Sequence, residues 1–247
     1  TSRPAAPGSW ARVAPRRASL PAVSRRAVTD RLVGTGVNDS TTTGDPQVDF
    51  TLDERRDAAV LTIGTFAYYG TREKFYAIID GVFDRLRATG CRNLVLDLRG
   101  NSGGDPFCAA HLLAYLAPAP VPYFARIYPS YATLAEPLSL PENRFRGSLY
   151  TLIDGGCASS TGHLCALLKF HKIGTFIGSD TGATYECNDA ARTETLTATG
   201  LRLRVARAIY TVAVEKMSRG KGVPPDHAVE PSIHDILSAR DPALERA

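Results

Sequence analysis

The sequence predicts an α/β fold in which helices cover a mostly parallel, buried sheet. Residues 58–66 and 93–98 form two apolar runs of strand length. Between them, residues 75–86 place apolar side chains at the spacing of one helix face, and Gly90 is positioned to end that helix. A strand, a helix and a strand joined by short links indicate a parallel βαβ unit. Continuous apolar runs are typical of strands buried on both faces.

The same alternation continues toward the carboxyl end. Residues 201–205 alternate apolar side chains with arginine, which predicts a half-exposed strand. The remaining expected elements are a helix at 106–116, a Pro-rich loop at 117–146, a strand at 148–153, a helix at 159–171, strands at 174–178 and 209–214, and two short helical turns within 233–247 that break before Pro242.

The length and composition are those of a globular protein with one large domain. The 247 residues are 44% hydrophobic and 22% charged, which excludes a wholly disordered chain, a collagen and a coiled-coil rod. Residues 1–46 are rich in Arg, Pro, Ser and Thr and lack the apolar stretch of a secretory signal peptide. We therefore expect an extension and linker at 1–46 and an α/β domain at 47–247.

The positive charge is concentrated in the first residues. Residues 1–34 hold seven Arg and one Asp, a net +6, so the rest of the chain carries −2 of the total of +4. The main domain therefore lacks the basic character of a nucleic-acid-binding protein. No apolar run approaches the roughly 20 residues that span a bilayer, so no membrane span is expected.

The cysteines do not indicate a metal site. The five cysteines include no CxxC pair, and no Cys/His spacing matches a zinc site. Five cysteines are too few for a disulfide scaffold, so we expect buried or half-buried thiols. One disulfide is compatible with the count.

Two loops each follow an expected buried strand, where α/β folds place ligands. The first, 97–105, reads DLRGNSGGD, and its glycines can turn backbone N–H groups toward an oxyanion or simply form a turn. The second, 154–163, reads DGGCASSTGH and leads into a helix. A serine at that position is either an N-cap or a nucleophile favoured by the helix dipole.

The two loops together resemble one family. A strand ends in DLRGNSGG, and about 50 residues later come a strand, a Ser-rich loop and a helix; the chain closes with GVPPDHAVEP at 222–231. This arrangement resembles the tail-specific (C-terminal-processing) serine peptidases, in the branch that includes interphotoreceptor-retinoid-binding-protein-like modules. The resemblance covers roughly residues 55–247.

The resemblance implies a ClpP/crotonase-like core, a serine nucleophile and an oxyanion hole built partly from the glycine loop. Gly103 and Gly104 fall on that loop. In the family the nucleophile lies about nineteen residues before the glycine that ends the next strand, which is Ser159 when counted back from Gly178. Ser160 is the alternative if the count slips by one residue.

The general base is left open. Many family members pair the serine with a lysine in a segment that here reads DTGATY at 180–185, so a Ser-Lys dyad is not expected. His163, four residues after Ser159, and His227, in the closing segment, are the leading candidates. His111 is a third, and a site without any histidine is the remaining alternative. The candidate partner acids are Asp105, Asp180 and Glu230.

The sequence therefore predicts a serine peptidase that hydrolyses extended polypeptides without a metal or organic cofactor. The resemblance favours an extracytoplasmic location and is compatible with a homo-oligomer. One alternative is a non-catalytic ligand- or peptide-binding module with the same fold. A crotonase-like acyl-CoA enzyme is a weaker alternative, because the closing PPD segment does not fit it.

Overall fold

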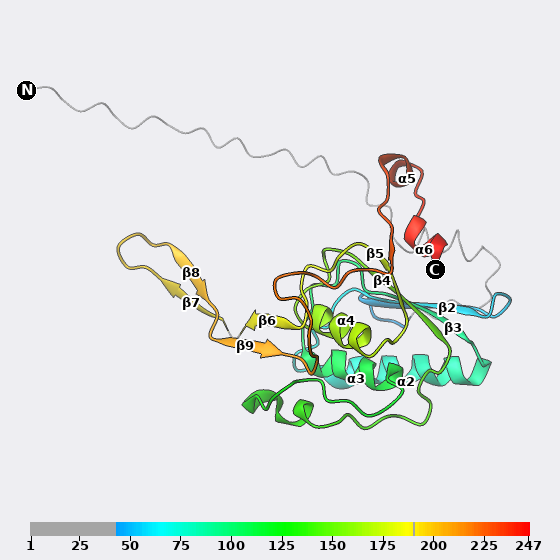
Figure 1. The fold of residues 1–247 in the computed structure, drawn as a ribbon, viewed down its shortest axis with the longest axis horizontal. Coiled ribbons are helices and arrows are strands. Elements are labelled where there is room, and N and C mark those ends of the chain that lie inside the picture. The colour runs from blue at the N-terminus through cyan, green and yellow to red at the C-terminus, as the bar shows by residue number, and fades with distance from the viewer. Residues whose placement is uncertain (1–42, 190) are drawn as a thin grey trace, which may run out of the picture.

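A six-stranded sheet forms the centre of the computed structural model, which describes residues 43–189 and 191–247 (Figure 1). The strand order is β1-β2-β3-β4-β5-β10, and all neighbouring strands are parallel except β1 and β2. The predicted α/β class with a mostly parallel sheet is confirmed. The strands are β1 (Val48–Asp53), β2 (Ala58–Ile63), β3 (Asn93–Asp97), β4 (Ser148–Ile153), β5 (Thr175–Gly178) and β10 (His227–Ala228).

Three helices pack side by side on one face of this sheet (Figure 1). They are α2 (Arg72–Thr89), α3 (Pro106–Leu116) and α4 (Ser160–Phe170). Helix α2 buries the apolar face predicted from its spacing, including Phe75, Ile79 and Phe83. It ends at Gly90, whose φ of 67° is the left-handed conformation that glycine adopts without steric cost. Almost every residue of α3 and α4 is buried, so these two helices form the centre of the core.

The C-terminal segment covers part of the opposite face of the sheet. Val60, Val95, Leu152 and Ile177 form a small apolar cluster there with Ala243 of helix α6. Helix α6 (Pro242–Arg246) and the preceding α5 (Ile233–Leu237) match the two helical turns predicted within 233–247.

Arg99 fastens α6 to the loop after β3. Its guanidinium donates two hydrogen bonds to Asp97 and two to Asp241, all between 2.7 and 2.9 Å. Asp241 is also the N-cap of α6, because its carboxylate accepts a hydrogen bond from the Leu244 N–H. The Arg99 side chain is only 15% exposed, so this ion triad is largely shielded from water.

Two antiparallel strand pairs, β6–β9 and β7–β8, form an arm that projects from the body (Figure 1). The predicted strand at 201–205 exists as β8, but all four of its residues are exposed rather than half of them. The reason is that β7–β8 extends away from the core and nothing in the described chain covers either face. The arm strands are β6 (Glu186–Asp189), β7 (Arg192–Thr195), β8 (Arg202–Val205) and β9 (Ala208–Thr211).

Two segments differ from the sequence-based expectation. The strand expected at 209–214 ends at Thr211, because Val212 turns into the core and its N–H binds the Tyr185 carbonyl. The loop expected at 117–146 contains a 3-10 helix, η1 (Pro129–Ala135). The five cysteines are free thiols, and all but Cys187 are buried.

The N-terminal extension lies almost wholly outside the described residues, so the division at residue 47 stays a prediction. Within the described part of the chain, no helix is both long and apolar enough to cross a membrane.

Candidate active site

The two loops singled out from the sequence meet at the carboxyl ends of β3 and β4. These strands are parallel neighbours, so the loops that follow them leave the sheet on the same edge. The Ala158 N–H donates to the Asn101 carbonyl at 3.1 Å, and the Gly100 N–H donates to Asp154 Oδ1 at 2.7 Å. The glycine loop and the serine loop are therefore joined by direct hydrogen bonds.

Asn101 organises the junction from a fully buried position. Its Nδ2 donates to the Ile63 carbonyl at 3.0 Å, which ties the glycine loop to the end of β2. Its Oδ1 accepts from the Gly103 N–H at 2.9 Å and from Thr161 Oγ1 at 2.8 Å. One side chain thus sets the spacing between the glycine loop and the first turn of α4.

Gly103 and Gly104 occupy positions that exclude a side chain. A Cβ on Gly103, whose φ is +96°, would lie 2.8 Å from Ser159 Cβ and 2.9 Å from Ser160 N. A Cβ on Gly104, whose φ is +148°, would lie 2.2 Å from the Phe66 carbonyl carbon. All three distances are shorter than the 3.0 Å below which Cβ contacts are essentially never found, so the close approach of the backbone to Ser159 requires glycine.

Ser159 stands at the turn between β4 and α4 in a conformation that disfavours side chains. Its φ and ψ are 51° and −126°. Such strain costs about 1–3 kcal/mol and concentrates at functional sites. The same strand–turn–helix geometry exposes the nucleophile in hydrolases that carry a serine at a sharp turn.

A cleft of about 540 Å³ opens in front of Ser159. Gly103 and Gly104 line it, together with Thr65, Tyr69 and residues of the arm such as Asp189. Ser160 does not line the cleft: its side chain is buried, and its hydroxyl donates to the Gly104 carbonyl at 3.2 Å. Of the two serines left open by the sequence, the geometry favours Ser159.

Cys187 of β6 is a neighbour of Ser159 that the sequence did not reveal. A hydrogen bond joins the Ser159 hydroxyl and the Cys187 side chain. Burial raises the pKa of the Cys187 thiol to about 11, so it is protonated at neutral pH. No motif could have identified it, because Cys187 reaches the site only through the pairing of β6 with β9.

His163 lies one turn into α4 and is 2% exposed, among the rings of Tyr123 and Phe124. Burial lowers the pKa of its imidazole to about 4, and a hydrogen bond with the Tyr210 backbone opposes this only in part. Among the described residues Nε2 has no hydrogen-bond partner, so the bond to Tyr210 is made by Nδ1. His163 is therefore neutral at pH 7, with an enclosed Nε2 that carries the lone pair.

His163 does not line the cleft, and neither do the other histidine and acid candidates. His227 is exposed on β10, beyond β5 from the serine loop. His111 Nε2 lies 2.6 Å from Asp80, and its ring stacks on Tyr76. Asp105 is fully buried, caps α3 and forms an ion pair with Arg72 at 2.5 Å. The other two candidate acids, Asp180 and Glu230, are exposed.

Ser159, Gly103 and Gly104 thus line one cleft, whereas His163 is buried beside Tyr123 and Phe124 and His227 is exposed on β10. Across residues 43–189 and 191–247, no group of three or more His, Cys, Asp or Glu side chains is arranged to hold a metal ion.

Comparison with known proteins finds one matching family model and several solved structures with a similar fold. The family model described as peptidase family S41 matches residues 57–229. No curated protein matches the chain. Among solved structures, a protein of Parabacteroides merdae ATCC 43184, solved as a candidate peptidase, gives a TM-score of 0.62 at 18% identity, over 90% of this chain and 68% of that one.

Two further structures are similar at the level of the fold. A lipoprotein from Streptococcus agalactiae gives a TM-score of 0.53 at 17% identity, over 83% of this chain and 72% of that one. Mature CPAF gives 0.53 at 14% identity, over 72% of this chain and 48% of that one. The chain thus spans about half the length of mature CPAF.

Proposed function

The chain belongs to peptidase family S41, and we propose that it is a serine peptidase that hydrolyses peptide bonds of extended polypeptides with Ser159 as the nucleophile. The observation that carries the proposal is the position of Ser159. It combines a strained turn, the start of a buried helix and contact with the glycine loop at the mouth of a cleft. An N-cap serine needs neither the strained turn nor the cleft, and Ser159 makes no capping hydrogen bond.

We assign the oxyanion hole to the backbone N–H groups of Gly104 and Ser160. The Gly103 N–H is already bonded to Asn101, which leaves it without a role as a donor to substrate. Neither Gly104 N nor Ser160 N has an acceptor among the described residues. Gly103 contributes by bringing the loop against Ser159 Cβ and Ser160 N. Backbone donors fixed in this way stabilise a developing oxyanion without reorganisation.

We assign the general base to His163. The bond from Nδ1 to the Tyr210 backbone fixes the tautomer, so Nε2 can accept a proton. The helix that begins just after Ser159 also carries His163, and side chains on a helix lean toward its N-terminus. Because the Ser159 hydroxyl is bonded to Cys187, that bond must break and Ser159 must turn toward His163 when substrate binds.

The proposed reaction has two halves. Ser159 Oγ attacks the carbonyl carbon while its proton passes to His163 Nε2, and the carbonyl oxygen becomes an oxyanion held by two N–H groups. His163 then gives the proton to the leaving nitrogen as the C–N bond breaks. A water molecule, deprotonated by His163, hydrolyses the resulting ester and restores the Ser159 hydroxyl.

The contact between Ser159 and Cys187 favours one alternative, a non-catalytic peptide-binding module with the same fold. A thiol with a pKa of about 11 and a hydroxyl stabilise each other but do not activate a nucleophile at neutral pH. The two functions are distinguished by whether Ser159 is reactive.

The test is labelling of the full chain by a fluorophosphonate probe, together with cleavage of an unfolded polypeptide. Ser159→Ala should abolish both, since loss of a nucleophile costs up to about 10⁶-fold in rate. Ser160→Ala should retain labelling of Ser159. His163→Gln should slow both by about 10²–10⁴-fold, whereas His227→Gln should not. Circular dichroism checks that each variant is folded.

The Cys187→Ala variant adds a control whose expected labelling rate differs between the two functions. If Cys187 holds the Ser159 hydroxyl away from the base, its removal should raise the labelling rate. A wild type that neither cleaves polypeptide nor reacts with the probe, together with an equally inert Cys187→Ala, would establish the binding module instead.

The extracytoplasmic location and the homo-oligomer expected from the resemblance stay predictions. The similarity to a protein that is a lipoprotein in Streptococcus agalactiae is in keeping with the first of them.

A further inference from the structure

Two neighbouring cavities lie at the amino ends of the strands. The larger, about 660 Å³, lies between the end of α2 and residues 142–148, and the smaller, about 360 Å³, lies between residues 144–147 and the end of α4. Both are lined by Arg144, Phe145, Arg146 and Gly147, so the two cavities share this segment as a common wall. We call the pair the basic groove.

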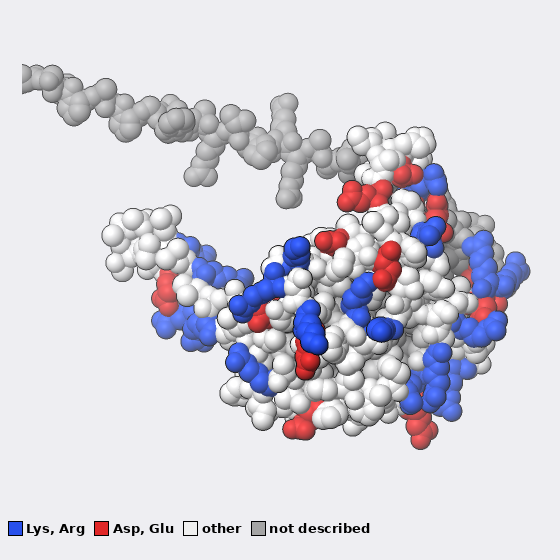
Figure 2. Space-filling view, viewed as in Figure 1, with Lys and Arg blue, Asp and Glu red and all other residues white. Residues whose placement is uncertain are grey.

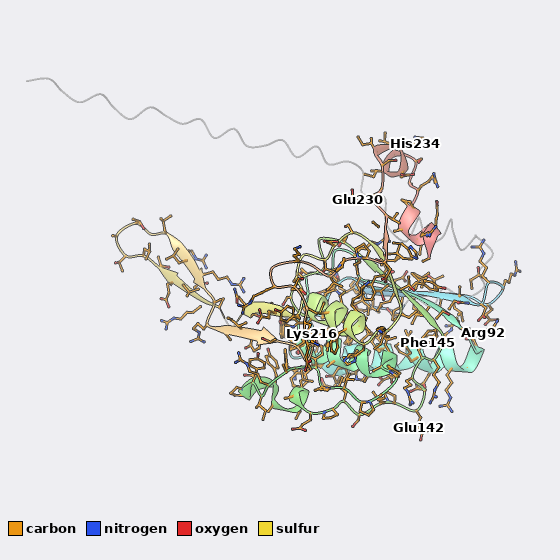
Figure 3. The ribbon with its side chains drawn as sticks, in the orientation of Figure 1. Arg92, Glu142, Phe145, Lys216, Glu230 and His234 are labelled. Atoms are coloured by element: carbon orange, nitrogen blue, oxygen red, sulfur yellow. The ribbon has the colours of Figure 1, made fainter. Side chains whose placement is uncertain are left out.

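The basic groove is lined by cations and almost no acids. Arg87, Arg92, Arg144 and Arg146 line the larger cavity, with Glu142 as its one carboxylate. Lys172 joins Arg144 and Arg146 in the smaller cavity, which has no acidic residue in its lining. Figure 2 shows Lys and Arg side chains gathered at one edge of the molecule. Figure 3, in the same orientation, labels Arg92, Phe145 and Glu142 at that edge.

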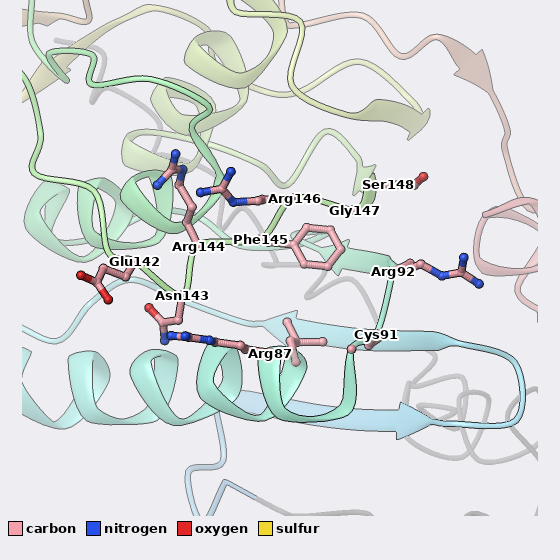
Figure 4. A pocket seen from close by; sticks show the side chains of 12 residues that line it. Arg87, Cys91, Arg92, Glu142, Asn143, Arg144, Phe145, Arg146, Gly147 and Ser148 are labelled. Atoms are coloured by element: carbon pink, nitrogen blue, oxygen red, sulfur yellow. The ribbon is translucent and has the colours of Figure 1, made fainter.

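Most of these cations lack a carboxylate partner in the described part of the chain. Arg92 forms an ion pair with Asp57 at 2.5 Å, and no ion pair of Arg87, Arg144, Arg146 or Lys172 occurs within residues 43–189 and 191–247. Arg144 and Arg146 extend to the same side of their segment, whereas Arg92 points away (Figure 4). Two guanidinium groups held on one side without a counter-ion repel each other, and an anion between them removes that repulsion.

The floor of the smaller cavity is apolar and contains one unsatisfied polar atom. Leu116, Leu149 and Ile173 line it between the charged side chains. His171 lines it as well, and its Nε2 is enclosed without a hydrogen-bond partner among the described residues. Buried polar atoms are normally hydrogen-bonded. A ligand in this cavity could supply the hydrogen-bonding group that His171 Nε2 lacks among the described residues.

We propose that the basic groove binds an acidic segment of a polypeptide, one in which carboxylates alternate with apolar side chains. The planar fork of arginine matches a carboxylate in bidentate geometry, and the apolar floor accepts the side chains between the acids. Each of the two cavities, at about 660 and 360 Å³, exceeds the size of a single small anion. The apolar side chains that line the smaller cavity favour a polypeptide over a nucleic acid, whose sugar-phosphate backbone has no apolar side chains to place against them.

The basic groove is separate from the Ser159 cleft. Strand β4 begins at Ser148, which lines the groove, and its carboxyl end leads to the serine loop. Six strand residues span about 20 Å at 3.3 Å each. Binding in the groove can therefore be measured whether or not Ser159 is catalytic.

The experiment measures the anisotropy of fluorescein-labelled peptides added to the full-length Ser159→Ala protein. One peptide alternates Glu with Leu, and its control alternates Gln with Leu. The Arg144→Gln/Arg146→Gln variant is compared with Arg55→Gln/Arg202→Gln, which loses the same charge at two exposed arginines outside the groove.

The Glu–Leu peptide should bind, and the groove variant should weaken its affinity by about three- to thirtyfold, because two pairs with partly exposed arginines are lost. The control variant should change the affinity less than about twofold. Binding should weaken as salt is raised from about 50 to 200 mM at constant pH.

Four outcomes would overturn the proposal. These are equal binding of the Gln–Leu peptide, equal losses in the two double variants, full displacement of the peptide by millimolar inorganic phosphate at constant ionic strength, and tighter binding of a single-stranded RNA that the groove variant abolishes. The third would identify a small-anion site and the fourth a nucleic-acid site.

Discussion

Replacing Arg99 by methionine tests what holds the C-terminal helix on the sheet. Methionine keeps much of the apolar stem but removes the guanidinium, and with it the four hydrogen bonds to Asp97 and Asp241. The two carboxylates, whose side chains are only 4% and 14% exposed, would then face each other without a cation.

The expected loss of unfolding free energy depends on how far the chain can avoid burying two carboxylates without a cation. Removing one partner of a buried ion pair typically destabilises a protein by about 3–5 kcal/mol. Helix α6 is only five residues long and fully buries only Ala243, so it can detach and hydrate Asp241. Detachment forfeits the packing of Ala243 and Leu244 on the sheet, worth about 1–3 kcal/mol. We therefore expect a loss of about 2–4 kcal/mol, with amide exchange accelerated first in α6.

The pH dependence gives a second readout. Burial alone would raise the pKa of the Asp241 carboxyl, but the hydrogen bonds and charge of Arg99 outweigh it and hold that pKa below its usual value of 3.8. A lowered pKa means that the ion triad stabilises the fold above about pH 4, and this contribution is lost as the pH falls further. Arg99→Met should remove that part of the acid sensitivity.

The assay is urea unfolding at pH 7 combined with hydrogen exchange, with Arg202→Met on the exposed strand β8 as the matched control. The reasoning is refuted if Arg99→Met costs less than about 1 kcal/mol and leaves the exchange of α6 amides unchanged.

Three further predictions concern the site. Gly103→Ala should leave the protein folded but abolish fluorophosphonate labelling, because the new Cβ lies 2.8 Å from Ser159 Cβ; normal labelling would show that the glycine loop does not contact the nucleophile. Asn101→Ala leaves the Ile63 carbonyl, the Gly103 N–H and the Thr161 hydroxyl without their partner, so urea unfolding should show a loss of about 2–4 kcal/mol. If His163 is the base, the labelling rate should stay level from pH 8 to about 5 and fall with a midpoint near the imidazole pKa of about 4; a midpoint more than one pH unit higher would show that His163 is not the base.

The sequence was most informative where a local rule decides the structure. The period of residues 75–86 defined the buried face of α2, and the helix expected at 106–116 is α3, with Pro106 as its first residue. The family resemblance read from DLRGNSGG and the closing segment is confirmed by the match at 57–229. The helix face follows from neighbouring residues alone, and the resemblance follows from two short motifs whose letters can be read without knowing the fold.

The sequence was least informative where distant segments meet. Residues 201–205 have the alternation of a half-buried strand, but alternation cannot tell whether a covering layer exists, and β8 has none. His163 and His227 could not be separated, because spacing does not reveal that one is enclosed behind the serine loop and the other is exposed beyond β5. Cys187 reached the site through strand pairing alone.

The strained backbone at Ser159 means that stability alone does not explain a serine at this position. At a φ of 51° and a ψ of −126°, glycine is the residue that folding alone would favour, because it adopts this conformation without steric cost. Ser159→Gly is therefore expected to raise the melting temperature while it removes the hydroxyl. Selection for stability alone would therefore favour glycine at this position. A serine here costs folding free energy, so it has to be maintained by a requirement other than stability.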